Sequence, residues 1–197
     1  MKNSNLSLDT PSEMDSTQIT KSQAGKPGAL SALIRPLIRD VPNFPKTGVM
    51  FRDITPLLQS AEAMESVLEA FGTALKIDEI EAFVGIESRG FILASMLATK
   101  YRKGFVPLRK AGKLPPPTHQ QSYNLEYGQA TLEIAPGQGR VVVIDDVLAT
   151  GGTLQAGIDL CRKAGYVVSG AAVLIDLQFL NQFRFDGRPV ASILQYT

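Results

Sequence analysis

Cysteine, histidine, tryptophan and long apolar runs are scarce or missing in this chain of 197 residues. The single cysteine, Cys161, excludes an intramolecular disulfide and favours a reducing compartment, which we expect to be the cytoplasm. No apolar run approaches the length of a membrane span, and a formal net charge of +1 predicts no strong attraction to nucleic acid or to a membrane. The single histidine, His119, lies in a loop-like stretch, and we assign it no role.

Apolar residues are also scarce in residues 1–28, which are rich in Ser, Thr, Asn, Gln and Lys. The segment has no hydrophobic signal-peptide core, and its acidic residues argue against a transit peptide. Because such a polar composition cannot bury enough surface to order itself, we predict a disordered tail here and one domain over residues 29–197.

Deleting residues 1–25 is therefore expected to leave activity and melting temperature nearly unchanged. Both quantities would be measured side by side for the truncated and the full-length chain. A large loss of either would show that the segment docks on the domain or across a subunit interface.

The most informative stretch is VVVIDDVLATGGT, at residues 141–153. Its first four residues are apolar and β-branched without polar alternation, which predicts a strand buried on both faces, as in parallel sheets. Two carboxylates, Asp145 and Asp146, come next, followed by a turn of small residues and a helical pattern. This order predicts a phosphate site at the carboxyl end of a parallel sheet.

The small turn and the acidic pair suit different parts of one ligand. Gly151 and Gly152 allow the backbone to approach an anion closely, and the helix start adds free N–H groups. Thr150 and Thr153 add hydroxyl donors. The two carboxylates would repel a phosphate but suit ribose hydroxyls or a divalent metal, so a phosphorylated ribose with Mg²⁺ meets both demands. The chain contains neither a Walker A loop nor a G-x-G-x-x-G motif.

The same order of strand, polar turn and helix is predicted earlier in the chain, over residues 82–100. Residues 82–86 predict a short buried strand, E-S-R-G at 87–90 a polar turn, and residues 91–100 a helix. Arg89, at the helix start, is suited to bind a phosphate group bidentately.

A cluster of cations follows the next expected strand, at residues 104–108. Arg109, Lys110 and Lys113 lie within five residues, and such a cluster at a strand end can neutralise pyrophosphate. Farther on, residues 122–134 alternate in character on both sides of a Tyr-Gly pair, which predicts a β-hairpin outside the core sheet and therefore a lid.

The remaining segments complete an alternating pattern. Helices are expected at residues 29–38, with a kink at Pro36, and 62–75, and strands at 167–175 and 192–196. Residues 39–59 are too irregular for a core element and too apolar for a free loop, so we interpret them as a covering segment. Alternating strands and helices with short turns predict an α/β fold with a mainly parallel sheet.

These motifs resemble those of the type I phosphoribosyltransferases. Residues 141–153 resemble the motif that binds 5-phosphoribosyl-1-pyrophosphate (PRPP). F-P-x-x-G-V-x-F-R-D-I-T-P-L-L, R-K-x-G-K-L-P, S-Y-x-L-E-Y-G and the ending S-I-L-Q-Y are similar to motifs of the adenine phosphoribosyltransferase family. The resemblance covers about residues 33–196.

The resemblance implies a twisted, mainly parallel β-sheet flanked by helices. It implies a hood from about residues 29–58 and the C-terminal segment, a core over about 60–180, and a flexible β-hairpin lid over about 111–134. The implied reaction converts adenine and PRPP to AMP and pyrophosphate in purine salvage. The family is typically homodimeric and uses Mg²⁺, held mostly by PRPP and water beside Asp145 and Asp146.

The candidate site residues form four groups under this resemblance. The catalytic group contains Glu126, Tyr127, Asp145, Asp146 and Arg89, and the 5′-phosphate group contains Ala149, Thr150, Gly151, Gly152 and Thr153. Pyrophosphate is assigned to Arg89, Arg109, Lys110 and Lys113, and adenine to Val49, Met50, Phe51, Arg52 and Leu148. Within the adenine group, the backbone of Arg52 would read the exocyclic amine and N1.

Two alternatives remain open at this point. One is a phosphoribosyltransferase for another base, such as guanine or xanthine, which the segment Val49–Arg52 and the lid residue Glu126 disfavour. The other is a PRPP-sensing regulator without catalysis, which we would expect to carry a nucleic-acid-binding element. Residues 1–28 show no helix-turn-helix pattern and no strong basic run.

Overall fold

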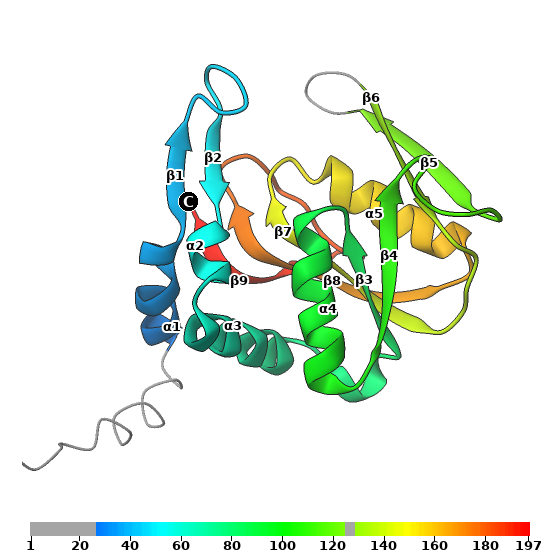
Figure 1. Ribbon diagram of the computed structural model, residues 1–197, viewed down its shortest axis with the longest axis horizontal. Coiled ribbons are helices and arrows are strands. Elements are labelled where there is room, and N and C mark those ends of the chain that lie inside the picture. The colour runs from blue at the N-terminus through cyan, green and yellow to red at the C-terminus, as the bar shows by residue number, and fades with distance from the viewer. Residues whose placement is uncertain (1–26, 125–128) are drawn as a thin grey trace, which may run out of the picture.

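Within residues 27–124 and 129–197, which the computed structural model describes, seven strands form one sheet in the order β5-β6-β4-β3-β7-β8-β9 (Figure 1). The strands are β3 (Ala82–Ile86), β4 (Gly104–Lys110), β5 (His119–Asn124), β6 (Gln129–Ile134), β7 (Arg140–Leu148), β8 (Val167–Leu177) and β9 (Ala191–Tyr196). Strands β4, β3, β7, β8 and β9 pair in parallel, whereas β5 and β6 form an antiparallel hairpin attached to β4. The predicted α/β fold with a mainly parallel sheet is confirmed. Glu126, Tyr127 and nearly all of the predicted tail lie outside the described residues.

Strand β7 lies between β3 and β8, and its apolar run at residues 141–144 is almost completely buried. The prediction that the strand ends before the acidic pair was wrong, because β7 continues to Leu148. Its pairing with β3 stops at Ile144, but its pairing with β8 continues as far as Leu148 opposite Asp176. Asp145 and Asp146 are therefore part of a strand whose edge toward β3 is no longer paired.

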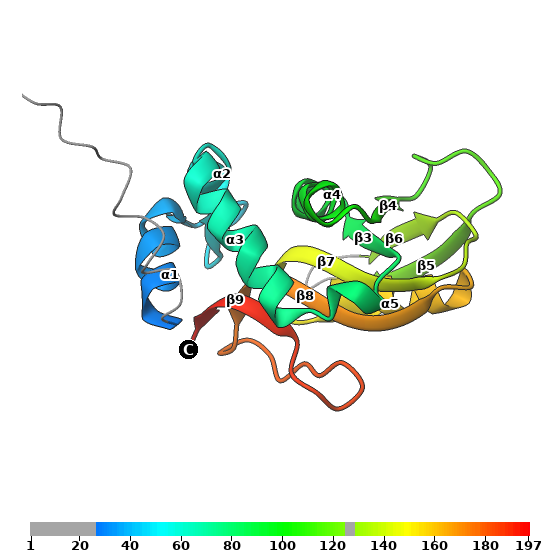
Figure 2. The ribbon, with the colours of Figure 1, turned by 90° about the horizontal axis from the view of Figure 1, so that it is seen from below.

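Helices cover both faces of the sheet (Figure 2). Helices α3 (Ala61–Ala74) and α4 (Arg89–Tyr101) lie on one face, and α5 (Gly152–Lys163) lies on the other. Alternate residues of β7 enter the two resulting cores: Val142 and Ile144 pack with α3 and α4, whereas Val141 and Val143 pack with α5. A strand with two buried faces needs an uninterrupted apolar run, which is the pattern that the sequence shows there.

The predicted helix over residues 29–38 is shorter in the structure. Helix α1 (Pro27–Ile34) ends before Pro36, which lies in the 3₁₀ turn η2 (Arg35–Leu37). A proline inside an α-helix removes a hydrogen bond and clashes with the preceding turn, which accounts for the end of α1 here. A second 3₁₀ turn, η3 (Ile77–Glu79), precedes β3.

The segment over residues 39–59 is more regular than predicted. Strands β1 (Arg39–Pro42) and β2 (Met50–Asp53) form a separate antiparallel pair, followed by the short helix α2 (Thr55–Leu58). Prolines and a glycine in the connection interrupt the alternation that would have indicated these strands.

The pair β1–β2 lies beside the C-terminus (Figure 1). The guanidinium of Arg52 in β2 stacks over the ring of Tyr196 in β9, with its carbon 4.2 Å from the ring centroid, and Arg35 lies 4.5 Å from the same centroid. Segments from the two ends of the domain thus meet beside the carboxyl ends of the core strands.

Cys161 is fully buried on α5. Burial raises the pKa of its thiol from 9.0 to about 12, so the thiol stays protonated near neutral pH. None of the described helices is both long and apolar enough to cross a membrane.

Candidate active site

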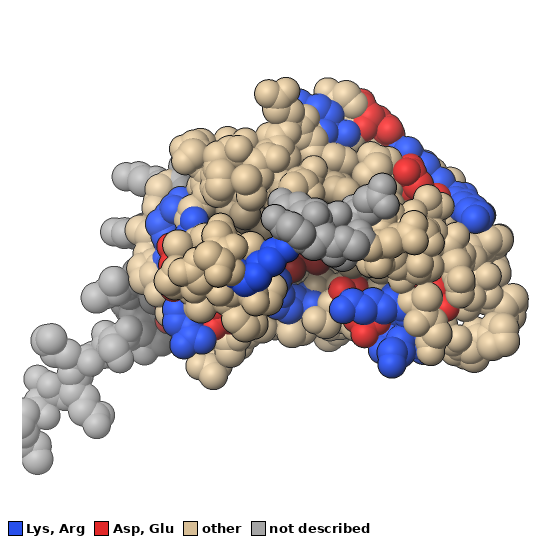
Figure 3. All heavy atoms as spheres, turned by 90° about the horizontal axis from the view of Figure 1, so that it is seen from above, with Lys and Arg blue, Asp and Glu red and all other residues tan. Residues whose placement is uncertain are grey.

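The candidate site lies where the chain reverses its direction of travel across the sheet. The chain runs from β3 outward to β4, and later from β7 outward to β8 and β9, so the reversal falls between β3 and β7. In open α/β sheets, ligands bind at such a switch point, outside the carboxyl ends of the strands. Viewed from this side, basic and acidic side chains lie next to each other in the middle of the face (Figure 3).

Arg89 begins α4 at this switch point and joins two parts of the candidate site. Its Nε lies 3.0 Å from Oδ2 of Asp146, and its Nη1 donates a hydrogen bond of 3.3 Å to the backbone carbonyl of Arg52. Its guanidinium also lies over the ring of Phe51, 4.7 Å from the centroid. The acidic pair and the predicted adenine segment are therefore brought together around one arginine.

Close packing at the start of α4 depends on a glycine. A Cβ at Gly90 would lie 2.7 Å from the carbonyl oxygen of Ile144 and 3.1 Å from Oδ1 of Asp145. Only a residue without a side chain lets the helix start approach the end of β7 this closely, so Gly90 helps place Arg89 beside Asp146.

The acidic pair is an unfavourable place for two negative charges. Burial raises the pKa of Asp145 well above its usual value, and the adjacent charge of Asp146 raises it further. Burial also raises the pKa of Asp146, although the Arg89 guanidinium opposes the shift. Oδ2 of Asp146 is buried and accepts no hydrogen bond from any described residue, despite its short distance to Arg89. Arg89 therefore balances the charge of Asp146 without a well-aligned hydrogen bond to this oxygen.

The predicted phosphate turn connects β7 to α5. Gly151 has a φ of +90°, a left-handed conformation that favours glycine, and it directly precedes the first residue of α5. No side chain of the described residues caps this helix start, so its first N–H groups point toward the turn without a side-chain acceptor. The hydroxyl-bearing Thr150 is exposed and Thr153 is half-buried.

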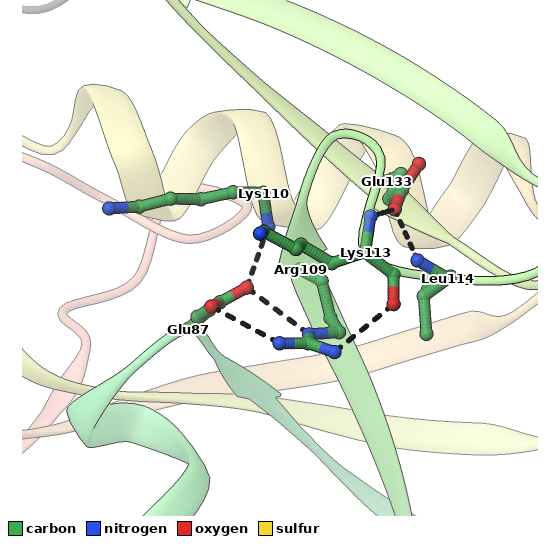
Figure 4. Close-up of polar contacts among 6 residues, drawn as sticks. All are labelled: Glu87, Arg109, Lys110, Lys113, Leu114 and Glu133. Carbon is green, nitrogen blue, oxygen red and sulfur yellow. Dashed lines mark hydrogen bonds and ion pairs between the residues drawn. The ribbon is translucent and has the colours of Figure 1, made fainter.

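The predicted strand over residues 104–108 extends to Lys110 in the structure, so Arg109 and Lys110 end β4 and Lys113 follows it. Glu87 holds the first two of these cations (Figure 4). The Arg109 guanidinium donates to both carboxylate oxygens of Glu87, at 3.2 and 3.3 Å, and Glu87 also accepts the backbone N–H of Lys110 at 2.9 Å. These contacts, with the Arg109 hydrogen bond as the largest, lower the pKa of Glu87. Among the described residues, the ammonium groups of Lys110 and Lys113 form no ion pair. The structure thus separates a paired arginine from two unpaired lysines.

The predicted adenine residues differ in how exposed their side chains are. Val49, Phe51 and Arg52 are half-buried, and Met50 is 45% exposed. The ring of Phe51 packs edge to face against Phe44, with centroids 5.1 Å apart. The side chain of Leu148 is buried in the core next to α5, so its assignment to adenine stays a prediction.

Two anchoring carboxylates, Glu87 and Glu133, were not among the predicted site residues. Glu133 in β6 is 1% exposed and accepts the backbone N–H groups of Lys113 and Leu114. The signal in the sequence was an acidic residue within an apolar strand pattern, Leu132-Glu133-Ile134, which is unusual for a buried position.

Residues 57–178 match the family model of the phosphoribosyl transferase domain. A parallel sheet with an acidic pair and a glycine turn at its switch point is also what that class of enzyme requires, so the fold and the site define a phosphoribosyltransferase. The chain is 56% identical over 163 residues to the adenine phosphoribosyltransferase of Bdellovibrio bacteriovorus, covering 83% of this chain and 99% of that protein.

Solved structures show the same relationship. The crystal structure of adenine phosphoribosyltransferase from Rhodothermus marinus superposes with a TM-score of 0.76 at 44% identity, covering 86% of this chain and 99% of that one. The enzyme of Saccharomyces cerevisiae, solved with adenine and an imino-altritol bisphosphate, superposes with a TM-score of 0.76 at 30% identity, covering 85% of this chain and 99% of that one. The chain belongs to the adenine phosphoribosyltransferase family.

Proposed function

We propose that this protein transfers the 5-phosphoribosyl group from PRPP to adenine, giving AMP and pyrophosphate in purine salvage. The observation that carries this proposal is the position of Arg89, which contacts both Asp146 and the backbone carbonyl of Arg52. One side chain thereby links the carboxylates suited to a ribose with the segment suited to a purine. The family membership of the chain supports the same reaction.

Charge separation in the reaction explains the residue types. Breaking the bond between C1′ and pyrophosphate places positive charge on the ribose and negative charge on the leaving group. Arg89, Lys110 and Lys113 would stabilise the leaving group, with Arg109 supporting them through its contacts to the same turn. Holding adenine and PRPP in line would supply about 7–11 kcal/mol of the barrier.

The acidic pair fits the ribose and a magnesium ion. Carboxylate oxygens are the ligands that Mg²⁺ prefers, and the pair lies on the part of β7 that is no longer paired with β3. Because the described residues contain no group of three or more His, Cys, Asp and Glu able to hold a metal, PRPP and water would supply the other ligands. The bound ion would neutralise charge on the pyrophosphate, while Asp145 and Asp146 would bind ribose hydroxyls and favour a cationic ring.

The 5′-phosphate of PRPP and the adenine base would lie on opposite sides of the acidic pair. The turn from Ala149 to Thr153 would hold the 5′-phosphate at the start of α5. The carbonyl of Arg52 has a second lone pair beyond the one used by Arg89, and would accept the adenine amine. The hairpin β5–β6 would act as the base of a lid that keeps water from PRPP.

A pyrophosphate-release assay with adenine, guanine, hypoxanthine and xanthine tests this proposal. Release with adenine alone is expected. Release with another base would assign the protein to a different purine, and no release with any base in the presence of Mg²⁺ and PRPP would favour a PRPP-binding regulator.

We further propose that the protein forms homodimers. The support is its family membership together with apolar side chains left exposed at α4 and β4, where Ile92 is 39% and Phe105 is 38% exposed. Sedimentation equilibrium would test the proposal, since a monomer at micromolar concentration would overturn it.

A further inference from the structure

Glu133 lies in strand β6 of the lid hairpin and contacts the basic turn over residues 110–114. In the sheet it lies directly opposite Arg109 of β4 on one side and directly opposite Gln120 of β5 on the other. Directly opposite residues of antiparallel strands point to the same face, so the three side chains are neighbours. Gln120 donates its side-chain amide to Oε2 of Glu133 at 3.3 Å.

The carboxylate of Glu133 holds the backbone of the basic turn. Its Oε1 accepts the N–H groups of Lys113 and Leu114 at 2.5 and 2.6 Å. Gly112, with a φ of +83°, supplies the left-handed residue that turns consecutive N–H groups toward one anion. Burial alone would raise the pKa of Glu133, but the amides of residues 112–114 and the Gln120 side chain together lower it. The carboxylate is therefore charged when it binds the turn.

Arg109 binds the backbone carbonyl of Lys113, whose N–H is bound by Glu133 (Figure 4). Its guanidinium donates to the backbone carbonyl of Lys113 at 3.1 Å while it is paired with Glu87. The N–H and the C=O of Lys113 are thus both fixed by residues that face each other across β4 and β6. The Lys113 side chain therefore extends from a fixed backbone, and its ammonium forms no ion pair with a described residue.

We propose that Glu133 is a positioning residue that directs the Lys113 ammonium toward the pyrophosphate of PRPP. The inference rests on the proposed function, because it takes Lys113 to be a pyrophosphate ligand. The proposal assigns a role in PRPP binding to a buried carboxylate that is remote in sequence from the basic turn. Loss of this carboxylate should weaken PRPP binding. Because β6 carries Glu133 and also forms one arm of the lid hairpin, the same residue ties the turn to the base of the lid.

Kinetics of Glu133→Leu test the proposal. Removing the acceptor frees two backbone N–H groups and lets the turn relax, so the KM for PRPP should rise roughly ten-fold or more. The KM for pyrophosphate in the reverse reaction should rise with it, whereas the KM for adenine should stay within about two-fold. Glu133→Gln retains an acceptor oxygen of the same reach and should recover most of the PRPP affinity.

Glu79→Leu is the matched control, because it makes the same substitution at an exposed glutamate of η3, whose carboxylate lies 3.4 Å from the Lys76 ammonium before the start of β3. Its KM for PRPP should equal that of the wild type. If Glu133→Leu does not fold, Glu133→Asp replaces it: the shorter carboxylate cannot reach the turn, and the KM for PRPP should still rise several-fold.

A double-mutant cycle with Lys113→Ala separates this proposal from the proposed function. If Glu133 acts through Lys113, the rise in KM for PRPP in Glu133→Leu/Lys113→Ala should be no larger than in Lys113→Ala alone. Fully additive effects would overturn the inference, as would a Glu133→Leu variant with a lower melting temperature and an unchanged KM for PRPP. An inactive wild type would instead refute the proposed function.

Discussion

Changing Asp145 and Asp146 together to Asn is expected to abolish turnover, by more than about 10³-fold in kcat, while the fold stays intact. Amides of the same shape preserve the packing at the end of β7, but they remove the charge that favours a cationic ribose and the hard oxygens that suit Mg²⁺. The change also removes the ion pair between Asp146 and Arg89, so the guanidinium is no longer held in the centre of the site. Steady-state kinetics with adenine, PRPP and Mg²⁺ measure the effect.

The effect of the Asp145→Asn/Asp146→Asn change on stability also has an expected direction. Because burial raises the pKa of both carboxyls, the folded state holds their protons more tightly than the unfolded state does. The wild type should therefore lose stability as the pH rises from the usual carboxyl range through these raised pKa values. The Asn pair lacks that loss, so its melting temperature at pH 8 should equal or exceed that of the wild type.

Asp159→Asn is a suitable control, since Asp159 is an exposed acidic residue on α5 outside the candidate site. It should retain wild-type kcat. An Asn pair at Asp145 and Asp146 that kept most of the activity would refute the assigned role of the acidic pair.

Replacing Glu126 by Leu is expected to lower kcat steeply, by about 10²–10⁴-fold, the usual contribution of acid–base assistance. The favoured neutral tautomer of adenine carries its hydrogen on N9, the atom that must attack the ribose. A carboxyl group beside N7 can place or share a proton there and so make N9 the nucleophile. Glu126 lies outside the described residues, in the connection between β5 and β6.

The KM for PRPP should change little in Glu126→Leu, because the predicted lid is separate from the turn that holds the 5′-phosphate. Glu126→Gln keeps the size of the side chain but lacks a titratable proton, and it should be nearly as slow. Near-normal kcat in Glu126→Leu would identify a solvent-facing hairpin glutamate and would assign the proton chemistry to another group or to water.

Local sequence patterns were enough to predict most of the helices and strands of the core and the central motif. The apolar run of residues 141–144 can be buried only with both faces covered, and the glycines and threonines after it suit an anion at a helix start. These properties depend on residues that are near one another in the chain, so the α/β fold and the turn between β7 and α5 were predictable. The pair β1–β2 was missed because prolines interrupt the local period on which such predictions depend.

The contacts between distant residues in the site depend on tertiary packing and could not be predicted from local patterns. The contact of Arg89 with both Asp146 and Arg52 depends on how α4 packs against β7 and β2. The pairing of Arg109 with Glu87, and the burial of Glu133 between β4 and β5, depend on strand register. Register is set by the packing of whole strands, so a local pattern can show that a carboxylate is buried but cannot show which backbone groups it binds.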